Sequence, residues 1–494
     1  MLTGSVGAVD EIDPEVTSPP AHMTPEEFRR HGREVIDWIA DYWERIESLP
    51  VASAVQPGDI RALLPDSAPE QPEPFEHLLA DLDRVVVPGV THWQHPGWFA
   101  YFPANNSPPS VLADAVSSGL GLIGLLWSAS PALTEIESHM LDWLVDLCAL
   151  PEHWKTTSEG GGVLQGSASD ATHVALVAAR HRVSARSGQP AEQMVAYTSA
   201  QAHSSVEKGA NIAGFGHVRL VEVDEHQAMR PDALAASVEA DISAGLVPTF
   251  VGSTVGTTGT TAVDPVRAIS AIAIEHSLWH HVDAAYAGTA MICPEFRHHN
   301  EGIELVDSYV FNPHKWMMVN FDCSAFYVAD KAALTDALSI DPPYLRNTQS
   351  DAGNVIDYRN WQVPLGRRFR ALKLWWVLRS YGAAGIRQMV RHHVAMAQEF
   401  AQRLSEDPRF EIVAPHPFSL VCFRCRAADD SPAARDAADS ATDAIAAAVN
   451  TSGIAYLTPS KLDGRSIIRV AVGQSRTDRS QMDLLWKLIS EAAV

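Results

Sequence analysis

Residues 277–283 read Ser-Leu-Trp-His-His-Val-Asp (SLWHHVD), a short run that ends on a carboxylate. A run of this length between polar and turn-forming residues predicts a buried strand. Four further runs of this kind lie nearby, and helical patterns separate several of them: QMVAY (193–197), HVRLVEV (217–223), PTFVGSTV (248–255) and DSYVFN (307–312). The alternation predicts an α/β domain with a mainly parallel sheet, in which ligands bind beyond the carboxyl ends of the strands.

Two charged residues at these strand ends are candidates for chemistry. Lys315 lies in residues 312–316 (NPHKW), directly after one predicted strand, and its neighbours are aromatic and apolar. Its amine is either solvated at a loop turn or kept neutral to form a Schiff base, and the lysine alone favours the first interpretation. Asp283, followed by Ala284 and Ala285, shifts the balance. Pyridoxal 5′-phosphate (PLP) needs a carboxylate at its pyridine nitrogen, and small residues leave room for its flat ring.

Two other segments could complete such a site. Residues 160–170 (GGGVLQGSASD) predict a Gly-rich loop that leads into a helix over 172–182. Small hydroxyl residues at a helix N-terminus favour phosphate binding, although a capped helix start explains them equally well. His203 follows the strand predicted over 193–197, and it is either an ordinary hydrogen-bonded histidine or a ring that stacks on a cofactor.

Taken together, these motifs resemble the PLP-dependent group II amino acid decarboxylases, specifically the aromatic-L-amino-acid decarboxylases. The motifs occur in the order of the family and at compatible spacing: QGSASDAT, QAHSSVEKGA, HVDAAYAG, NPHKW and WQVPLGRRFRALKLWWVLRSYG. The resemblance runs from about Thr24 over nearly the whole chain. It implies PLP fold type I, the aspartate aminotransferase-like fold, with a helical N-terminal segment and a small α+β C-terminal domain.

By this resemblance the cofactor is PLP, held as an internal aldimine on Lys315 with Asp283 at its pyridine nitrogen. Ala285 lies under the ring and His203 stacks on the opposite face. The other cofactor-binding residues that the resemblance implies are Ser167, Ala168, Ser169 and Asn312 around the phosphate, His314 beside the Schiff base and Thr258 near the ring hydroxyl or Asp283.

The reaction that the resemblance implies is decarboxylation of an aromatic L-amino acid to the arylalkylamine and CO2, through the Lys315 aldimine and a quinonoid intermediate. Its catalytic residues are Lys315, Asp283, His203 and Tyr344, the last as proton donor on a loop. In relatives with phenylalanine at the Tyr344 position the product is an aldehyde, so Tyr344 and His203 favour the amine. An aromatic aldehyde synthase on the same fold is the alternative. An aminotransferase, a cysteine desulfurase and a non-catalytic PLP-fold scaffold are more distant ones.

The substrate pocket that the resemblance implies has aromatic and apolar walls. Its residues are Trp93, Tyr101, Phe102, Pro103, Ala104, Ile123, Leu125, His203 and Gly366, with Ile123 and Leu125 reaching across from a second subunit. Ala104 replaces the threonine of animal relatives and Leu125 a usual phenylalanine, and both differences weaken the case for a catechol preference. Gly366 matches a position where glycine leaves room for indole. Tryptophan therefore ranks ahead of phenylalanine, tyrosine and DOPA.

Composition points to a cytoplasmic protein without a nucleic-acid or membrane partner. The chain has 494 residues and a net charge of −23, which would repel nucleic acid and anionic lipid. Five scattered cysteines suggest reduced thiols, and the lone pair Cys422 and Cys425 on a predicted strand lacks the second pair that a zinc site needs, so no metal is expected. The N-terminal residues do not have the pattern of a signal peptide.

The organisation that we expect has four parts: a disordered tail over 1–22, an N-terminal helical dimerisation segment over 23–107, a large PLP-binding domain over 108–378 and a small C-terminal domain over 379–494. The first helix should begin at Thr24, because Thr24-Pro25-Glu26-Glu27 has the pattern of a capping box. The resemblance implies a pocket shared between two chains and therefore an obligate homodimer.

Overall fold

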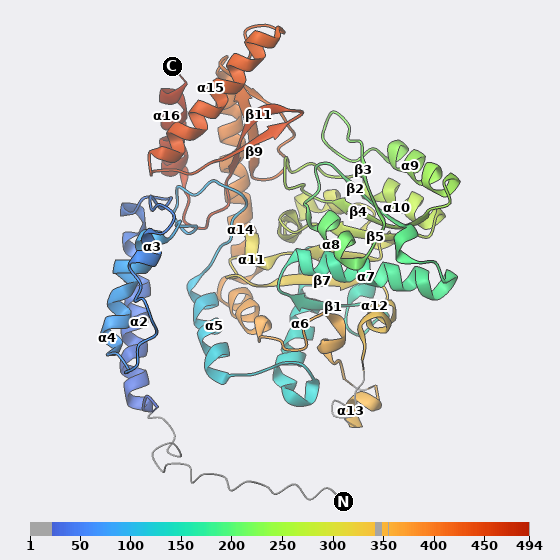
Figure 1. Cartoon of the computed structure of the whole chain (residues 1–494), viewed down its shortest axis with the longest axis horizontal. Helices are drawn as coiled ribbons and strands as arrows, with labels where there is room; N and C mark the ends of the chain where they lie inside the picture. Colours follow the sequence, from blue (N-terminus) through green and yellow to red (C-terminus); the bar gives the residue numbers. More distant parts are fainter. Residues whose placement is uncertain (1–21, 341–347, 354, 494) are drawn as a thin grey trace, which may run out of the picture. The chain divides into compact units, whose positions relative to one another are not determined.

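The computed structural model describes residues 22–340, 348–353 and 355–493. The chain groups into two compact units, Met1–Thr91 and His92–Val494, and most of their helices and strands are labelled in Figure 1. The four-part division expected from the sequence stays a prediction.

The first unit is helical. Helix α2 (Pro25–Arg45) begins where the sequence predicts, because the Thr24 hydroxyl accepts from the Glu27 N–H at 3.2 Å and the Glu27 carboxylate accepts from the Thr24 N–H at 2.8 Å. Phe28 and Ile36 on this helix are 68% and 42% exposed. The unit also contains α3 (Asp59–Ala62) and α4 (Phe75–Asp81).

A seven-stranded sheet forms the core of the second unit, in the order β1-β7-β6-β5-β4-β2-β3. Only β7 runs against its neighbours β1 and β6, so the sheet is mainly parallel, which confirms the predicted fold class and all five predicted strands. The carboxyl ends of the other strands therefore meet at one edge. The bounds are β1 (Gly161–Gln165), β2 (Met194–Ser199), β3 (His217–Val221), β4 (Val247–Thr254), β5 (Trp279–Asp283), β6 (Ser308–Phe311) and β7 (Ser324–Val328).

Strand β1 corrects one expectation. Residues Gly161–Gln165 form a strand rather than a Gly-rich loop, and the following helix α7 (Ala168–Ser187) begins before the predicted start at residue 172. A Cβ on Gly161 would come 2.7 Å from the Trp361 ring, and one on Gly162 would come 2.8 Å from the Tyr327 ring. These glycines allow close packing of large rings on the strand, so here they do not signal a flexible loop.

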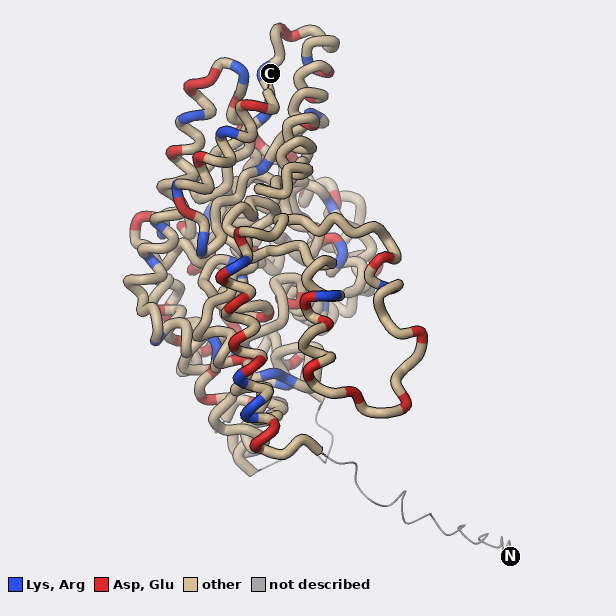
Figure 2. Tube along the Cα trace, turned by 90° about the vertical axis from the view of Figure 1, so that its left-hand side faces the viewer, with Lys and Arg blue, Asp and Glu red and all other residues tan. Residues whose placement is uncertain are grey.

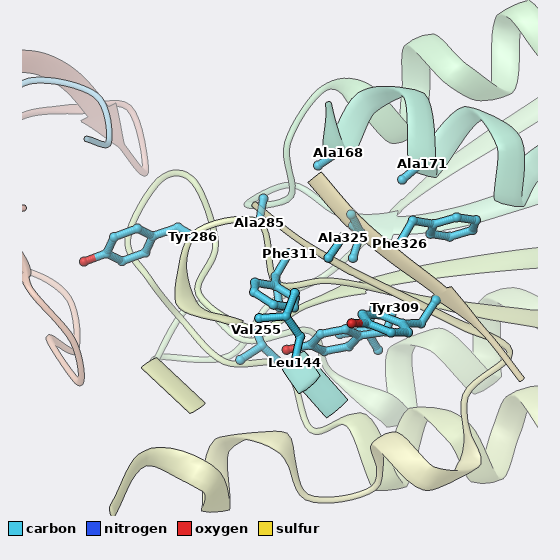
Figure 3. Packing of buried hydrophobic residues seen from close by; sticks show 14 of the residues in the cluster. Leu144, Ala168, Ala171, Val255, Ala285, Tyr286, Tyr309, Phe311, Ala325 and Phe326 are labelled. Atoms are coloured by element: carbon cyan, nitrogen blue, oxygen red, sulfur yellow. The ribbon is translucent and has the colours of Figure 1, made fainter. Parts of the chain in front are cut away.

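Helix α7 packs across β1, β7, β6, β5 and β4. It contributes Ala168 and Ala171 to a large buried cluster, to which the sheet adds Phe311, Ala325 and Phe326 (Figure 3). The second unit also contains α5 (Pro108–Leu120), α6 (Pro131–Cys148), α8 (Ser205–Ala213), α9 (Pro231–Ser243), α10 (Val266–Glu275), α11 (Pro313–Trp316), α12 (Lys331–Leu338) and α13 (Thr348–Asp351).

A second, antiparallel sheet follows in the order β10-β11-β9-β8. Helix α14 (Arg370–Glu406) leads into it and is interrupted at Gly382, which has φ 63°. The helix predicted near 367–381 is therefore only the first part of a longer element. Cys422 and Cys425 lie on β9 as predicted, both unpaired and buried. The remaining elements are β8 (Phe410–Ile412), β9 (Leu420–Cys425), α15 (Pro432–Thr451), β10 (Thr458–Leu462), β11 (Arg465–Ala471) and α16 (Arg479–Ala492).

Acidic and basic residues are interspersed along the helices, as Figure 2 shows. Within the residues that the structure describes, no helix combines the length and the apolar character needed to cross a membrane.

Candidate active site

A cavity of about 180 Å³ lies at the carboxyl edge of the large sheet. The sheet topology explains its position, because β1, β5 and β6 all end at this edge, just before or at the residues that line it. Strands β5 and β6 are neighbours, and β7 separates β6 from β1. All ten residues predicted to bind the cofactor contribute to its lining: Ser167, Ala168, Ser169, His203, Thr258, Asp283, Ala285, Asn312, His314 and Lys315.

Lys315 enters the cavity from the short helix α11, which follows β6 directly. Its Nζ lies 5.5 Å from the centre of the Phe102 ring. Burial lowers the pKa of Lys315 below its ordinary value; the Asp283 carboxylate opposes this shift and the Arg469 guanidinium adds to it. A lysine with a lowered pKa keeps more of its amine neutral, which is the form that attacks a carbonyl carbon.

Asp283 is the last residue of β5 and is buried. Its Oδ1 accepts a hydrogen bond from the Ala285 N–H at 2.8 Å, which fixes the orientation of the carboxylate. Ala285 lines the cavity with nothing larger than a methyl group. A carboxylate held next to a flat space can pair with a protonated ring nitrogen.

The start of α7 supplies hydrogen-bond donors, whereas Asp283 supplies a negative charge. The Ser167 hydroxyl accepts from the Asp170 N–H at 3.1 Å and caps the helix, whose first N–H groups lack intrahelical acceptors. Together with the helix dipole they favour an anion. The Asn312 side chain also lines the cavity, and because its Oδ1 accepts from the Ser324 hydroxyl at 2.7 Å, its NH₂ group is the part that can donate to a ligand.

Two histidines line the cavity as neutral rings. His203 Nδ1 accepts from the Ser205 N–H at 3.1 Å. Burial lowers the pKa of His203; the Asp283 carboxylate opposes this shift and the Lys315 amine adds to it. His314 Nδ1 accepts from the Cys323 N–H at 2.9 Å, and burial lowers the pKa of His314 to about 3.

Two of the predicted substrate residues line this cavity, and four others contact residues outside its lining. Phe102 lines it together with His203. The rings of Trp93 and Tyr101 stack with their centres 5.5 Å apart. The Pro103 ring packs closely on Gly473, because a Cβ on Gly473 would lie 2.6 Å from that ring. The Ala104 carbonyl accepts from the Gln94 side chain at 2.6 Å.

Ile123, Leu125 and Gly366 form a separate group. The Gly124 N–H donates to the Arg367 carbonyl at 3.0 Å, and the Ile123 Cγ2 atom lies 3.8 Å from the point that a Cβ on Gly366 would occupy. The part of the cavity lining that the structure describes does not include this group. Tyr344 lies outside the described residues.

The residues around the cavity fit PLP. An amine, a carboxylate and the N-terminus of a helix face one cavity, and they match the aldehyde, the ring nitrogen and the phosphate of the cofactor. The Gly256 backbone also lines the cavity at φ 84°, where a Cβ would come 2.7 Å from Ala287. The backbone there leaves no room for a larger residue.

Comparison with known proteins assigns the family. The pyridoxal-dependent decarboxylase conserved domain matches residues 57–426. The chain belongs to the pyridoxal-dependent decarboxylases. Phenylacetaldehyde synthase of Arabidopsis thaliana is 45% identical over 476 residues, which cover 95% of this chain and 96% of that protein. Tryptophan decarboxylase 2 of Oryza sativa subsp. japonica is 43% identical over 477 residues, which cover 95% of each protein.

The fold agrees with this assignment. A crystal structure of Oryza sativa TDC with PLP and tryptamine matches with a TM-score of 0.93 and 41% identity, over 97% of this chain and 99% of that one. The predicted cofactor, PLP, and the predicted enzyme class, a carboxy-lyase, are confirmed by the family. The roles of the single residues stay predictions.

The cavity of this decarboxylase also contains residues that were not predicted as site residues. Thr254, Gly256 and Tyr286 line it, and Thr254 is the strand neighbour of Asp283. The end of the predicted strand over 248–255 is a signal that could have found Thr254. Arg469 of β11 donates to the Thr258 carbonyl at 2.8 Å and lies 5.3 Å from the centre of the Phe102 ring. Because Arg469 is far from Thr258 and Phe102 in the sequence, no local pattern could have indicated this contact.

Proposed function

We propose that this decarboxylase converts an aromatic L-amino acid into the arylalkylamine and CO2. The observation that carries the proposal is the placement of Lys315 and Asp283 in one cavity with the aromatic wall Phe102. The relatives add support, because one is named a tryptophan decarboxylase and another a phenylacetaldehyde synthase. Tryptophan ranks first among the candidate substrates because Gly366 adds no side chain to the proposed pocket.

PLP, when bound, supplies an electron sink for the pair left on Cα as CO2 departs. Lys315 Nζ would hold the cofactor covalently until the substrate amine replaces it. Asp283 would stabilise the positive charge on the ring nitrogen. The N-terminus of α7, with Ser167 and Ser169, would hold the phosphate, and the Asn312 amide would donate to it.

The remaining residues set the direction of the reaction. The bond between Cα and the carboxylate must stand perpendicular to the cofactor ring, so the walls of the cavity decide which bond breaks. His203 is proposed to cover one face of the ring and to orient the substrate carboxylate. Phe102 would provide an apolar wall that keeps water away from the substrate carboxylate. Tyr344 is proposed to deliver the proton to Cα, and this step gives an amine.

An aldehyde synthase is the second candidate, because the relative from Arabidopsis thaliana carries that name. Such an enzyme takes up dioxygen and water and releases the aldehyde, CO2, ammonia and hydrogen peroxide. The two activities therefore differ in their stoichiometry.

A product balance tests the proposal. The purified enzyme with PLP is given tryptophan, phenylalanine, tyrosine, DOPA or glutamate, and CO2, amine, ammonia and peroxide are measured in the same reaction. We expect one amine for each CO2 with aromatic substrates and none with the Lys315→Ala control. No CO2 from any aromatic substrate would overturn the proposal, and one peroxide for each CO2 would replace it with the aldehyde synthase.

We also propose a cytoplasmic homodimer in which the two chains share their active sites. Ile123 is 58% exposed and Phe28 on α2 is 68% exposed, as expected for residues that a second chain covers. The five unpaired, buried cysteines agree with a reducing compartment. Mixing an inactive Lys315→Ala variant with an inactive Ile123→Asp variant should restore activity if Ile123 serves the site of the partner. No recovery in mixed dimers would contradict the shared site.

A further inference from the structure

One face of β5 carries Trp279, His281 and Asp283, because alternate residues of a strand point the same way. Helix α7 packs over this strand, and its Arg182 guanidinium lies 4.7 Å from the centre of the Trp279 ring. Trp279 and His281 are almost fully buried. The proposed mechanism uses only Asp283, so the buried histidine two residues before it has no role there.

His281 belongs to a chain of hydrogen bonds that runs from the sheet to the start of α7. The Trp279 indole N–H donates to the Ser308 hydroxyl at 2.8 Å, and the Ser308 hydroxyl lies 2.9 Å from His281 Nδ1. On the other side of the ring, His281 Nε2 lies 3.3 Å from the Thr172 hydroxyl. The Thr172 hydroxyl donates in turn to the Ala168 carbonyl at 2.9 Å.

The two ends of this chain fix its direction. An indole can only donate and a peptide carbonyl can only accept. The single hydroxyl hydrogen of Thr172 is used on Ala168, so His281 Nε2 must be the donor to Thr172. His281 Nδ1 then accepts from Ser308. Burial lowers the pKa of His281 to about 4, which agrees with a neutral ring that carries its proton on Nε2.

The hydrogen bond from the Thr172 hydroxyl to the Ala168 carbonyl orients a peptide group of the proposed phosphate site. The carbonyl of Ala168 and the N–H of Ser169 belong to one peptide group, and in a planar trans peptide they point in opposite directions. A carbonyl held toward Thr172 therefore directs the Ser169 N–H toward the open end of the helix. That end lines the cavity with Ser167, Ala168 and Ser169.

We propose that His281 is a positioning residue for the cofactor phosphate, which holds the first turn of α7 in register with Asp283 through Thr172 and Ala168. The inference rests on the proposed function, in which this turn binds the phosphate of PLP. His281 thus couples the strand that holds the ring nitrogen to the helix that holds the phosphate.

The neighbouring His280 is a matched control. It is as buried as His281 and also makes two hydrogen bonds, to the Ser253 hydroxyl at 2.7 Å and the Ser270 hydroxyl at 2.9 Å. Its side chain points to the other face of β5, and Ser270 lies on α10. A merely structural role would give His280 and His281 the same importance for cofactor binding.

The experiment compares two probes on the apoenzyme, PLP and pyridoxal, the second of which lacks the phosphate. His281→Leu should raise the Kd of PLP roughly tenfold, equivalent to about 1.4 kcal/mol, and should leave the Kd of pyridoxal within about twofold. Thr172→Val, which keeps the shape of the side chain, should have the same selective effect. The double variant should bind PLP as tightly as the single variant with the lower affinity, because both changes break the same series of hydrogen bonds. His280→Leu should lower thermal stability without changing the Kd of PLP.

Several results would overturn the inference. They are an unchanged PLP affinity in both His281→Leu and Thr172→Val, an equal loss for PLP and pyridoxal, or an equal loss in His280→Leu. If His281→Leu does not fold, Thr172→Val alone decides between these outcomes. A wild-type apoenzyme that binds pyridoxal as tightly as PLP would instead overturn the proposed phosphate site, so the two failures can be distinguished.

Discussion

Replacing Asp283 with asparagine separates the charge of this carboxylate from its hydrogen bond. The Oδ1 atom of an asparagine can still accept from the Ala285 N–H, which Asp283 contacts at 2.8 Å, so the local backbone should keep its shape. What is lost is the negative charge opposite the ring nitrogen. A hydrogen bond to a charged group contributes about 1.5–3 kcal/mol, so the Kd of PLP should rise roughly 10- to 150-fold.

Turnover at saturating PLP should fall further, by roughly 10²–10³-fold, the range seen when one preorganised polar group is removed. The charge also affects Lys315, because the Asp283 carboxylate raises the pKa of that lysine against the effect of burial. In Asp283→Asn the pKa of Lys315 should therefore be lower still. The apoenzyme should then react with an amine-selective reagent at Lys315 at a lower pH than the wild type.

Two measurements check this reasoning: a titration of the apoenzyme with PLP, followed by the absorbance of the lysine-bound cofactor, and CO2 release at saturating PLP. Asp283→Ala serves as the comparison that removes both the charge and the hydrogen bond. An Asp283→Asn enzyme with wild-type PLP affinity and wild-type turnover would show that the charge has no role at the ring.

Three further outcomes test residues outside the described lining of the cavity. Tyr344→Phe should divert the product from amine to aldehyde, and an unchanged amine yield without peroxide would contradict the assignment of Tyr344 as proton donor. Gly366→Ser should fold normally, because the point where its Cβ would lie is 3.8 Å from Ile123, and it should reduce kcat/KM for tryptophan more than for tyrosine; an unchanged ratio would remove the pocket argument. Thermal stability should fall as the pH drops below about 6.5, the ordinary histidine pKa, because burial lowers the pKa of His280 to about 3. The unfolded chain then binds a proton that the folded one does not, at a cost of up to about 1.4 kcal/mol per pH unit. The His280→Leu variant should show a shallower fall.

The strand ends of the large sheet could be predicted because short apolar runs and the residues after them are local signals. Asp283, Lys315 and His203 were found in this way, and the structure brings all three to one cavity. Strand β1 was missed because Gly161 and Gly162 look like loop residues until the rings of Trp361 and Tyr327 are seen to pack on them.

Other features depend on contacts between distant segments. Arg469 reaches the Thr258 carbonyl and the Phe102 ring from β11, and nothing around it in the sequence indicates this position. The hydrogen bonds of His281 to Ser308 and Thr172 also join three separate elements. A periodic pattern predicts which residues are buried, but it does not predict the partners of a buried polar group.

The reversed strand β7 has a consequence for the biosynthesis of the protein. Strand β1 lies at the edge of the sheet and its neighbour is β7, with Gly161 opposite Val328. A ribosome that adds roughly 5–20 residues per second needs about 10–30 s to synthesise the chain between these two residues. During this time the backbone groups of β1 cannot form their native hydrogen bonds, and Lys315 is completed only near the end of the interval. The cofactor can therefore be captured only after most of the large sheet has left the ribosome.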